Sequence, residues 1–123
     1  MQTLELGREF MRHVQAGNIE GAKSCLHSDA EIWHNYDNVV QTVAENMALL
    51  ALMIDKCADR QYTIHYLEEI NGGYLQRHQL TVTGHDGTSV TEEVVALIKV
   101  TDGKITRVDE WLDPTGIRQL LAG

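Results

Sequence analysis

Apolar residues recur at helical spacing along the first part of the chain. This spacing predicts a helix over residues 4–16, which ends at Gly17. Asn18 is a suitable N-cap for a second, short helix over residues 19–26. The positions expected to face the interior are Leu6, Phe10, Met11, Val14, Ala22, Cys25 and Leu26.

A strand over residues 29–36 and a third helix follow. The strand contains most of the stretch Glu-Ile-Trp-His-Asn-Tyr-Asp at 31–37, which places an indole, an imidazole and an amide in a row. Thr42 and Glu45 form a capping-box pattern, which predicts the start of the third helix. One side of that helix presents Met47, Leu50, Ala51, Ile54 and Ala58.

From residue 60 onward the hydrophobic period changes to two, which predicts strands. We expect four of them, near 60–70, 74–84, 90–101 and 104–112. The segments between them are Asn71-Gly72-Gly73, Asp86-Gly87 and Asp102-Gly103, which are typical of tight hairpin turns. Helices followed by an antiparallel meander predict an α+β fold, with the sheet curled around the long helix to leave a cone with a mouth.

Composition limits the classes of partner. We expect the 123 residues to form one domain, 1–123, and a net charge of −8 argues against nucleic acid or an anionic membrane as partner. The first residues include acidic side chains where a secretion signal would have a basic flank, and no apolar run is long enough to cross a bilayer. Cys25 and Cys57 lack a paired spacing. We therefore expect a cytoplasmic protein with reduced core cysteines.

Three stretches resemble a known family. They are AGNIEGAKSCLHSDAEIWHN at 16–35, YLQRHQL at 74–80 and VTDGKITRVDEWLD at 100–113. Together they resemble the SnoaL-like proteins of the NTF2-like superfamily over nearly the whole chain. The resemblance implies a cone in which three N-terminal helices pack on a strongly curved antiparallel or mixed sheet. This fold is used by isomerases, dehydratases, cyclases, epoxide hydrolases and binding domains, so it implies no single function.

Strand alternation assigns side chains to the two faces of the predicted sheet. Gln76, His78, Glu92 and Glu110 fall on the concave side, and His34 shares a face with Ile32 and Tyr36. Trp33, Asn35 and Trp111 fall on the opposite faces of their strands. The superfamily commonly forms homodimers through the outer sheet face, so the resemblance implies that Trp33 and Trp111 lie in such an interface.

The resemblance places His34 where ketosteroid isomerases of this superfamily have their general base. The tyrosine that supplies one oxyanion donor in those enzymes falls on Phe10, and the protonated aspartate falls near Ala96. Both donors are therefore replaced by apolar residues. A ketosteroid isomerase activity is not expected.

The limonene-epoxide-hydrolase type offers a second comparison, because it uses an arginine and two aspartates. Its C-terminal aspartate falls on Glu110, its arginine on Arg77 and its other aspartate on Gln79. Only the arginine is retained, and alternation places Arg77 on the face opposite His78. The histidines of scytalone dehydratases have no assigned counterparts here.

The candidate site combines groups suited to acid–base chemistry. His34 has an ordinary pKa near 6.5, so it can exchange a proton at neutral pH. Gln76 and His78 can hold a carbonyl or hydroxyl group, and an inward carboxylate at Glu110 requires a partner. The candidate catalytic residues are His34, His78 and Glu110, and the candidate substrate-binding residues are Gln76, Tyr66, Glu92, Trp33 and Asn35. Tyr62 is a second source of a phenol.

Two hypotheses follow. The first is a cofactor-free enzyme that moves a proton next to a carbonyl of a small, largely apolar molecule, giving isomerisation, cyclisation or dehydration. The second is a non-catalytic ligand-binding or dimerisation module in which the polar groups pair among themselves. The histidine spacing matches no metal motif, and a site built from His34, His78 and Glu110 is the one combination that metals accept. We expect neither a metal nor a cofactor.

Overall fold

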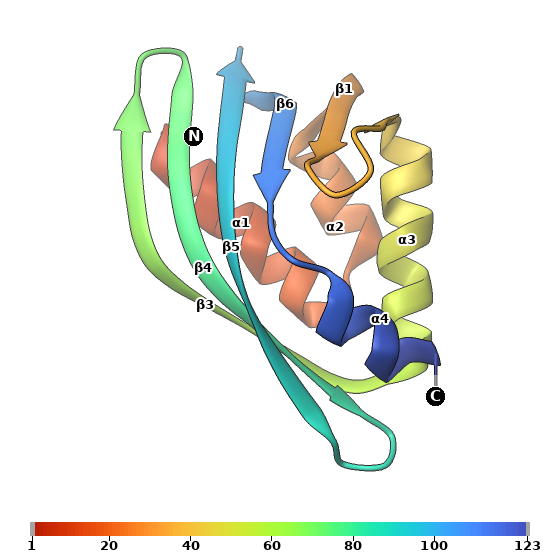
Figure 1. Ribbon diagram of the computed structural model, residues 1–123. Helices are drawn as coiled ribbons and strands as arrows, with labels where there is room; N and C mark the ends of the chain where they lie inside the picture. The colour runs from red at the N-terminus through yellow and green to blue at the C-terminus, as the bar shows by residue number, and fades with distance from the viewer. Residues whose placement is uncertain (1, 123) are drawn as a thin grey trace.

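The computed structural model describes residues 2–122 as a strongly curved six-stranded sheet with helices packed in its concave side (Figure 1). The helices are α1 (Thr3–Ala16), α2 (Ile19–Ser24), α3 (Val43–Lys56) and α4 (Thr115–Ala122). The strands are β1 (Leu26–His34), β2 (Val40–Gln41), β3 (Cys57–Ile70), β4 (Gly73–Gly84), β5 (Ser89–Thr101) and β6 (Lys104–Trp111). The predicted α+β class is confirmed.

The sheet is mixed, in the order β2-β1-β6-β5-β4-β3. The meander from β3 to β6 is antiparallel, as the glycine turns predict. β1 joins it beside β6, and this pair is parallel. The first strand of the chain therefore lies next to the last one, which brings the EIWHNYD segment against the C-terminal hairpin.

Local signals in the sequence set most element boundaries. The Asn18 side chain accepts a hydrogen bond from Gly21 N at 3.0 Å, and the Thr42–Glu45 capping box is complete. The short helix ends two residues earlier than predicted, so β1 begins at residue 26 rather than 29. β3 begins at residue 57, directly after α3. The sequence reasoning predicted no helix corresponding to α4.

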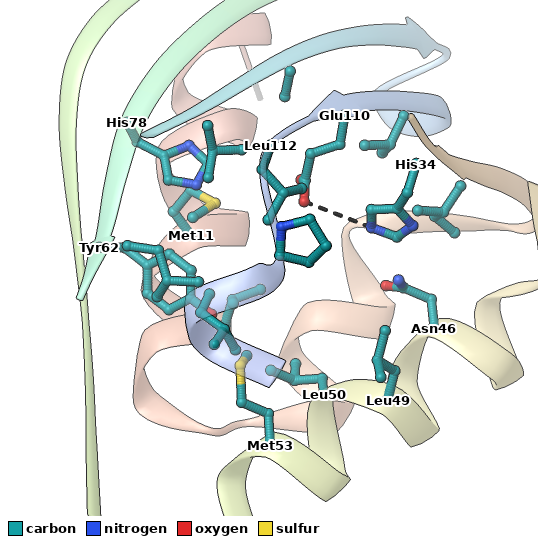
Figure 2. A pocket seen from close by; sticks show the side chains of 18 of the residues that line it. Met11, His34, Asn46, Leu49, Leu50, Met53, Tyr62, His78, Glu110 and Leu112 are labelled. Atoms are coloured by element: carbon teal, nitrogen blue, oxygen red, sulfur yellow. Dashed lines mark ion pairs between the residues drawn. The ribbon is translucent and has the colours of Figure 1, made fainter. Parts of the chain in front are cut away.

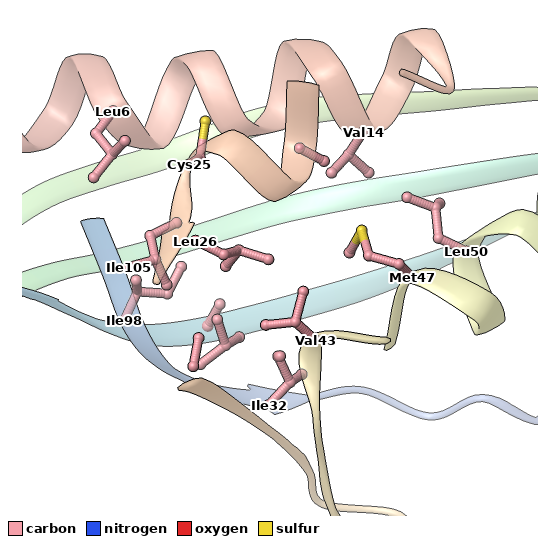
Figure 3. Close-up of a cluster of buried hydrophobic side chains, with 14 of the residues drawn as sticks. Leu6, Val14, Cys25, Leu26, Ile32, Val43, Met47, Leu50, Ile98 and Ile105 are labelled. Carbon is pink, nitrogen blue, oxygen red and sulfur yellow. The ribbon is translucent and has the colours of Figure 1, made fainter. Parts of the chain in front are cut away.

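The core lies between the helices and the concave face of the sheet. Figure 3 shows its main cluster, with Leu6 and Val14 from α1, Met47 and Leu50 from α3, and Ile98 and Ile105 from the sheet. A second cluster lies beneath α4 and contains Cys57, Leu80, Val82, Val94 and Ile117. Both cysteines are buried and free. Within residues 2–122, no helix combines the length and apolar character that crossing a membrane requires.

Candidate active site

A cavity of about 260 Å³ opens between the sheet, α1, α3 and α4. Most of its wall is apolar, with Met11, Leu50 and Met53 among the helix side chains that face it (Figure 2). The polar side chains in its wall are few and come from different elements. They are His34, Tyr36, Asn46, Tyr62, Gln76, His78, Glu110 and Arg118.

His34 and Glu110 face each other across the parallel pair of strands. They are register partners in β1 and β6, and His34 Nε2 lies 3.6 Å from Glu110 Oε1 (Figure 2). The distance suits an ion pair but exceeds a hydrogen bond. His34 is 5% exposed, and its Nδ1 has no hydrogen-bond partner within residues 2–122. The Glu110 side chain is 27% exposed, so its carboxylate remains accessible from the cavity.

Gln76 and His78 form a second polar pair on β4. They are two residues apart on one strand, so both face the concave side, and both are buried. Gln76 Nε2 lies 2.8 Å from His78 Nδ1. With the amide nitrogen as donor, His78 Nδ1 accepts and the imidazole proton resides on Nε2. Burial lowers the pKa of His78, and the charges of Glu110 and Glu93 oppose this only in part.

Gln76 has one polar atom left over. Its Oε1 is buried and finds no donor in the described part of the chain, although the residue lines the cavity. Nearby, the Tyr62 ring lies 5.9 Å from the His78 ring, centroid to centroid. Burial raises the pKa of Tyr62, so its phenol stays protonated. This end of the cavity thus combines two donors, His78 Nε2 and Tyr62 Oη, with one acceptor.

At the other end of the cavity, polar side chains of the wall reach the surface. The Tyr36 ring is stacked on His34, with centroids 5.1 Å apart and an interplanar angle of 29°. Arg118 of α4 lies over the Tyr36 ring, with Cζ 4.7 Å from its centroid. A continuous stack therefore runs from exposed Arg118 to buried His34.

A family model described as the SnoaL-like domain matches residues 7–108. The chain belongs to the SnoaL-like family. Among curated proteins, none matches this sequence.

Solved structures show the same fold as this SnoaL-like protein. TerC, co-crystallised with polyporic acid, has 20% sequence identity and a TM-score of 0.82, with 98% of each chain covered. An NTF2-like protein of unknown function from Burkholderia pseudomallei K96243 has 16% identity and a TM-score of 0.83, with 100% of each chain covered. An LEH-like epoxide hydrolase from M. tuberculosis has 17% identity and a TM-score of 0.80, with 98% of this chain and 90% of that one covered. At these identities the likeness establishes the NTF2-like fold alone.

Residues that the resemblance compares with other catalytic sets of the superfamily lie in different places in this SnoaL-like protein. Phe10 and Ala96, where the resemblance places the isomerase oxyanion donors, line the cavity as apolar residues. Arg77, where it places the epoxide-hydrolase arginine, is exposed and lies outside the cavity.

Two predicted substrate-binding residues of the SnoaL-like chain lie elsewhere. Tyr66 is 45% exposed, and its hydroxyl donates to Glu68. A bulge between Ile64 and Tyr66 interrupts the alternation of β3, so Tyr62 faces the cavity while Tyr66 does not. Glu92 lies outside the cavity for another reason. α4 covers it, and a Cβ built at Gly116 would lie 2.8 Å from Glu92 Oε1.

Trp33 and Asn35 also lie outside the cavity, as their place in the alternation indicates. Trp33 Nε1 donates to Asn38 Oδ1 at 2.7 Å, and its ring meets Trp111 edge-on, with centroids 5.4 Å apart. Asn35 Oδ1 accepts from Leu112 N at 2.9 Å. Trp33 thus belongs to the convex face, and Asn35 joins β1 to the end of β6.

The sequence reasoning missed three polar residues of the wall. Asn46 is on α3, where its amide donates to Gln41 Oε1 at 3.0 Å. Tyr36 follows the end of β1, and Arg118 lies on the unpredicted helix α4. The spacing of Ile117, Leu120 and Leu121 after Pro114 was the signal that could have located α4. Among residues 2–122, no group of three or more His, Cys, Asp or Glu side chains could hold a metal ion.

Proposed function

We propose that this SnoaL-like protein is a cofactor-free acid–base enzyme acting on a small, largely apolar compound that contains a carbonyl or hydroxyl group. The observation that supports it most directly is that one carboxylate, two imidazoles and a buried amide line the same, mostly apolar cavity. Its volume, about 260 Å³, suits a small ligand. Apolar surroundings strengthen each electrostatic contact with a bound molecule.

The proton is taken by Glu110 in this proposal, and His34 assists it. Nδ1 of His34 has no hydrogen-bond partner in the described chain, so Nε2 is the nitrogen that interacts with Glu110. With a proton on Nε2, the imidazole directs an N–H toward Glu110 Oε1 at 3.6 Å. This assignment reverses the roles of the two residues suggested by the sequence. His34 positions and stabilises the carboxylate, and Glu110 acts as the base.

The oxygen of the ligand is held at the other end of the cavity. His78 Nε2–H and the Tyr62 hydroxyl are donors for a carbonyl oxygen, and Gln76 Oε1 is an acceptor for a hydroxyl. Neutral donors in a low-dielectric site stabilise the charge that develops on oxygen when a neighbouring C–H bond breaks.

The proposed reaction is proton abstraction next to a carbonyl. The C–H proton moves to Glu110, the electron pair forms an enolate whose oxygen is held by His78, and Glu110 returns the proton to another position. Isomerisation follows directly. Cyclisation follows when the enolate carbon adds to a second carbonyl whose oxygen takes the proton from Glu110, and dehydration follows when the enolate expels a β-hydroxyl group that leaves as water with that proton. A positioned acid–base group contributes roughly 10²–10⁴-fold to the rate.

The reaction can be tested without knowing the natural substrate. The protein is incubated in D₂O with a panel of small cyclic and aryl ketones, and uptake of deuterium next to the carbonyl is followed by NMR. We expect accelerated exchange that falls by roughly 10²-fold or more in Glu110→Gln. Glu92→Gln is the matched control, because it removes a carboxylate that α4 covers outside the cavity.

The role of His34 is separated by two replacements. His34→Gln retains an N–H donor near the position of Nε2, and His34→Ala does not. We expect His34→Gln to keep more activity than His34→Ala if His34 supports the carboxylate. Equal loss in both variants would instead assign the base to His34.

The second hypothesis, a binding module, is supported by the Gln76–His78 hydrogen bond, since the two groups already satisfy each other in part. It predicts that phenols and ketones shift the His78 resonances while no member of the panel exchanges faster than in buffer. That result would contradict the enzyme hypothesis and support the hypothesis of a ligand-binding module.

A further inference from the structure

The cavity has one permanent positive charge at its mouth, and nothing in the acid–base proposal uses it. Arg118 lies on α4 and is the one Lys or Arg among the described residues that line the cavity. It forms no ion pair with any acidic side chain within residues 2–122.

The orientation of Arg118 leaves its hydrogen-bond donors available. Its guanidinium carbon lies over the face of Tyr36, 4.7 Å from the ring centroid. A guanidinium group carries its N–H donors in a planar fork that matches a carboxylate. The contact with the Tyr36 ring is a cation–π contact and not a hydrogen bond, so it uses none of these donors.

The position of Arg118 relative to the reacting groups is also defined. Tyr36 is stacked on His34 at 5.1 Å, and His34 lies 3.6 Å from Glu110. A ligand that follows this stack inward has one end beside Arg118 and its interior next to Glu110. Glu110 is the one Asp or Glu among the described residues of the wall. The two charges therefore favour an anionic group at the mouth and disfavour one near the base.

We propose that the cavity selects small carboxylates, with Arg118 binding the carboxylate group of the ligand at the mouth. This inference rests on the proposed function, since it names the class of substrate for that same cavity. Arg118 is a specificity-determining residue in this scheme, and the apolar body of the ligand lies between α3 and the sheet.

The test compares carboxylates with their uncharged amides. Benzoate, phenylacetate and cinnamate are each paired with benzamide, phenylacetamide and cinnamamide, and affinities are measured by calorimetry while the His34 and His78 resonances report occupancy of the cavity. We expect each carboxylate to bind about tenfold more tightly than its amide, as one charge-assisted contact provides. The preference should weaken as salt concentration rises.

Three variants assign the preference to Arg118. Arg118→Gln should remove the preference, and Arg118→Lys should retain part of it because the charge is kept. Arg8→Gln is the matched control, since Arg8 is an exposed arginine on a helix outside the cavity. It should leave the preference unchanged.

The outcomes distinguish the two proposals. Equal binding of acids and amides with shifted His34 and His78 resonances would overturn the role of Arg118 and leave the acid–base proposal standing. The same holds if the preference persists in Arg118→Gln. If no member of either series binds or perturbs these histidines, both the carboxylate preference and the proposed cavity function fail.

Discussion

The amide nitrogen of Gln76 lies 2.8 Å from Nδ1 of His78, in the interior of the protein. This contact fixes the imidazole proton on Nε2, and burial lowers the pKa of His78 from its ordinary value of 6.5. The unfolded chain therefore binds a proton at a higher pH than the folded protein does. Stability rises with pH up to about 6.5 and is lost as pH falls below it, down to the lowered pKa of the folded state.

His78→Gln tests this dependence. From about pH 8 to about pH 5, the free energy of unfolding measured with urea should decrease in the wild type, and it should decrease less in the variant. His65→Gln, which removes an exposed histidine, should follow the wild type. If the unfolding free energies of all three proteins change equally with pH, the lowered pKa of His78 would be contradicted. Nitrogen NMR of His78 should show protonated Nε2.

Tyr74 offers a test of packing. Its side chain is fully buried, and its hydroxyl has no hydrogen-bond partner in the described structure. Since an unpaired buried hydroxyl costs roughly 1–3 kcal/mol, Tyr74→Phe should stabilise the fold by about 1 kcal/mol. Tyr66→Phe, at an exposed position, should change the unfolding free energy by less than about 0.5 kcal/mol. A destabilised Tyr74→Phe protein would refute this account.

Gly7 lies against the same tyrosine from α1. A Cβ at Gly7 would come within 2.9 Å of Tyr74 Cζ, so Gly7→Ala should destabilise the protein by roughly 1–3 kcal/mol in thermal unfolding, despite the better helix propensity of alanine. The double variant, Gly7→Ala with Tyr74→Phe, should be less destabilised than the sum of the two separate changes in unfolding free energy predicts, because the two residues touch. Strict additivity would show that the contact is not strained.

Arg60 is a buried cation that stabilises the end of α1. Its Nη2 donates to Val14 O at 3.2 Å and to Gln15 O at 2.9 Å, two carbonyls of the last helical turn. Arg60→Met should lower the unfolding free energy by about 2–3 kcal/mol in urea titrations, because the carbonyls lose their charged donor. Arg8→Met is the surface control. Matching midpoints for the two variants would indicate that the contacts contribute nothing.

The convex face of the sheet is expected to form a homodimer. Trp111 is 40% exposed and Val95 is 38% exposed, and they are register partners on β6 and β5, beside Trp33. We expect the wild type to sediment as a dimer and Trp111→Lys to sediment as a monomer, because a two-fold interface would bring two added charges together. Val39→Lys, at an exposed apolar position in the segment after β1, should remain dimeric. A monomeric wild type would exclude the interface.

Hydrophobic period and turn chemistry are local properties, so they predicted helices α1 to α3, strands β1 and β3 to β6, and part of the cavity wall, but neither β2 nor α4. Alternation along β4 placed Gln76 and His78 on one face, where both line the cavity. The same rule put Trp33 and His34 on opposite faces, and the structure has them so. These inferences needed no knowledge of which strands are neighbours.

The remaining parts depend on long-range contacts. The bulge after Ile64 changes the face of Tyr66, and nothing in the local composition marks a bulge. Glu92 shares the concave side with its register partner Leu80, but its environment is set by a helix that the sequence reasoning did not predict. The 3.6 Å approach of His34 and Glu110 depends on a parallel register between strands far apart in sequence.

That parallel pairing also determines when the protein can fold during synthesis. β1 has two neighbours, β2 and β6, and the register partners His34 and Glu110 are separated by most of the chain. While the ribosome is still producing β5, β1 therefore has an unpaired edge and the cavity lacks its carboxylate. Helices α1 to α3 form from local contacts, but closure of the sheet waits for the last strand. Such non-local closure slows folding and exposes strand edges to other nascent chains until residue 110 has emerged.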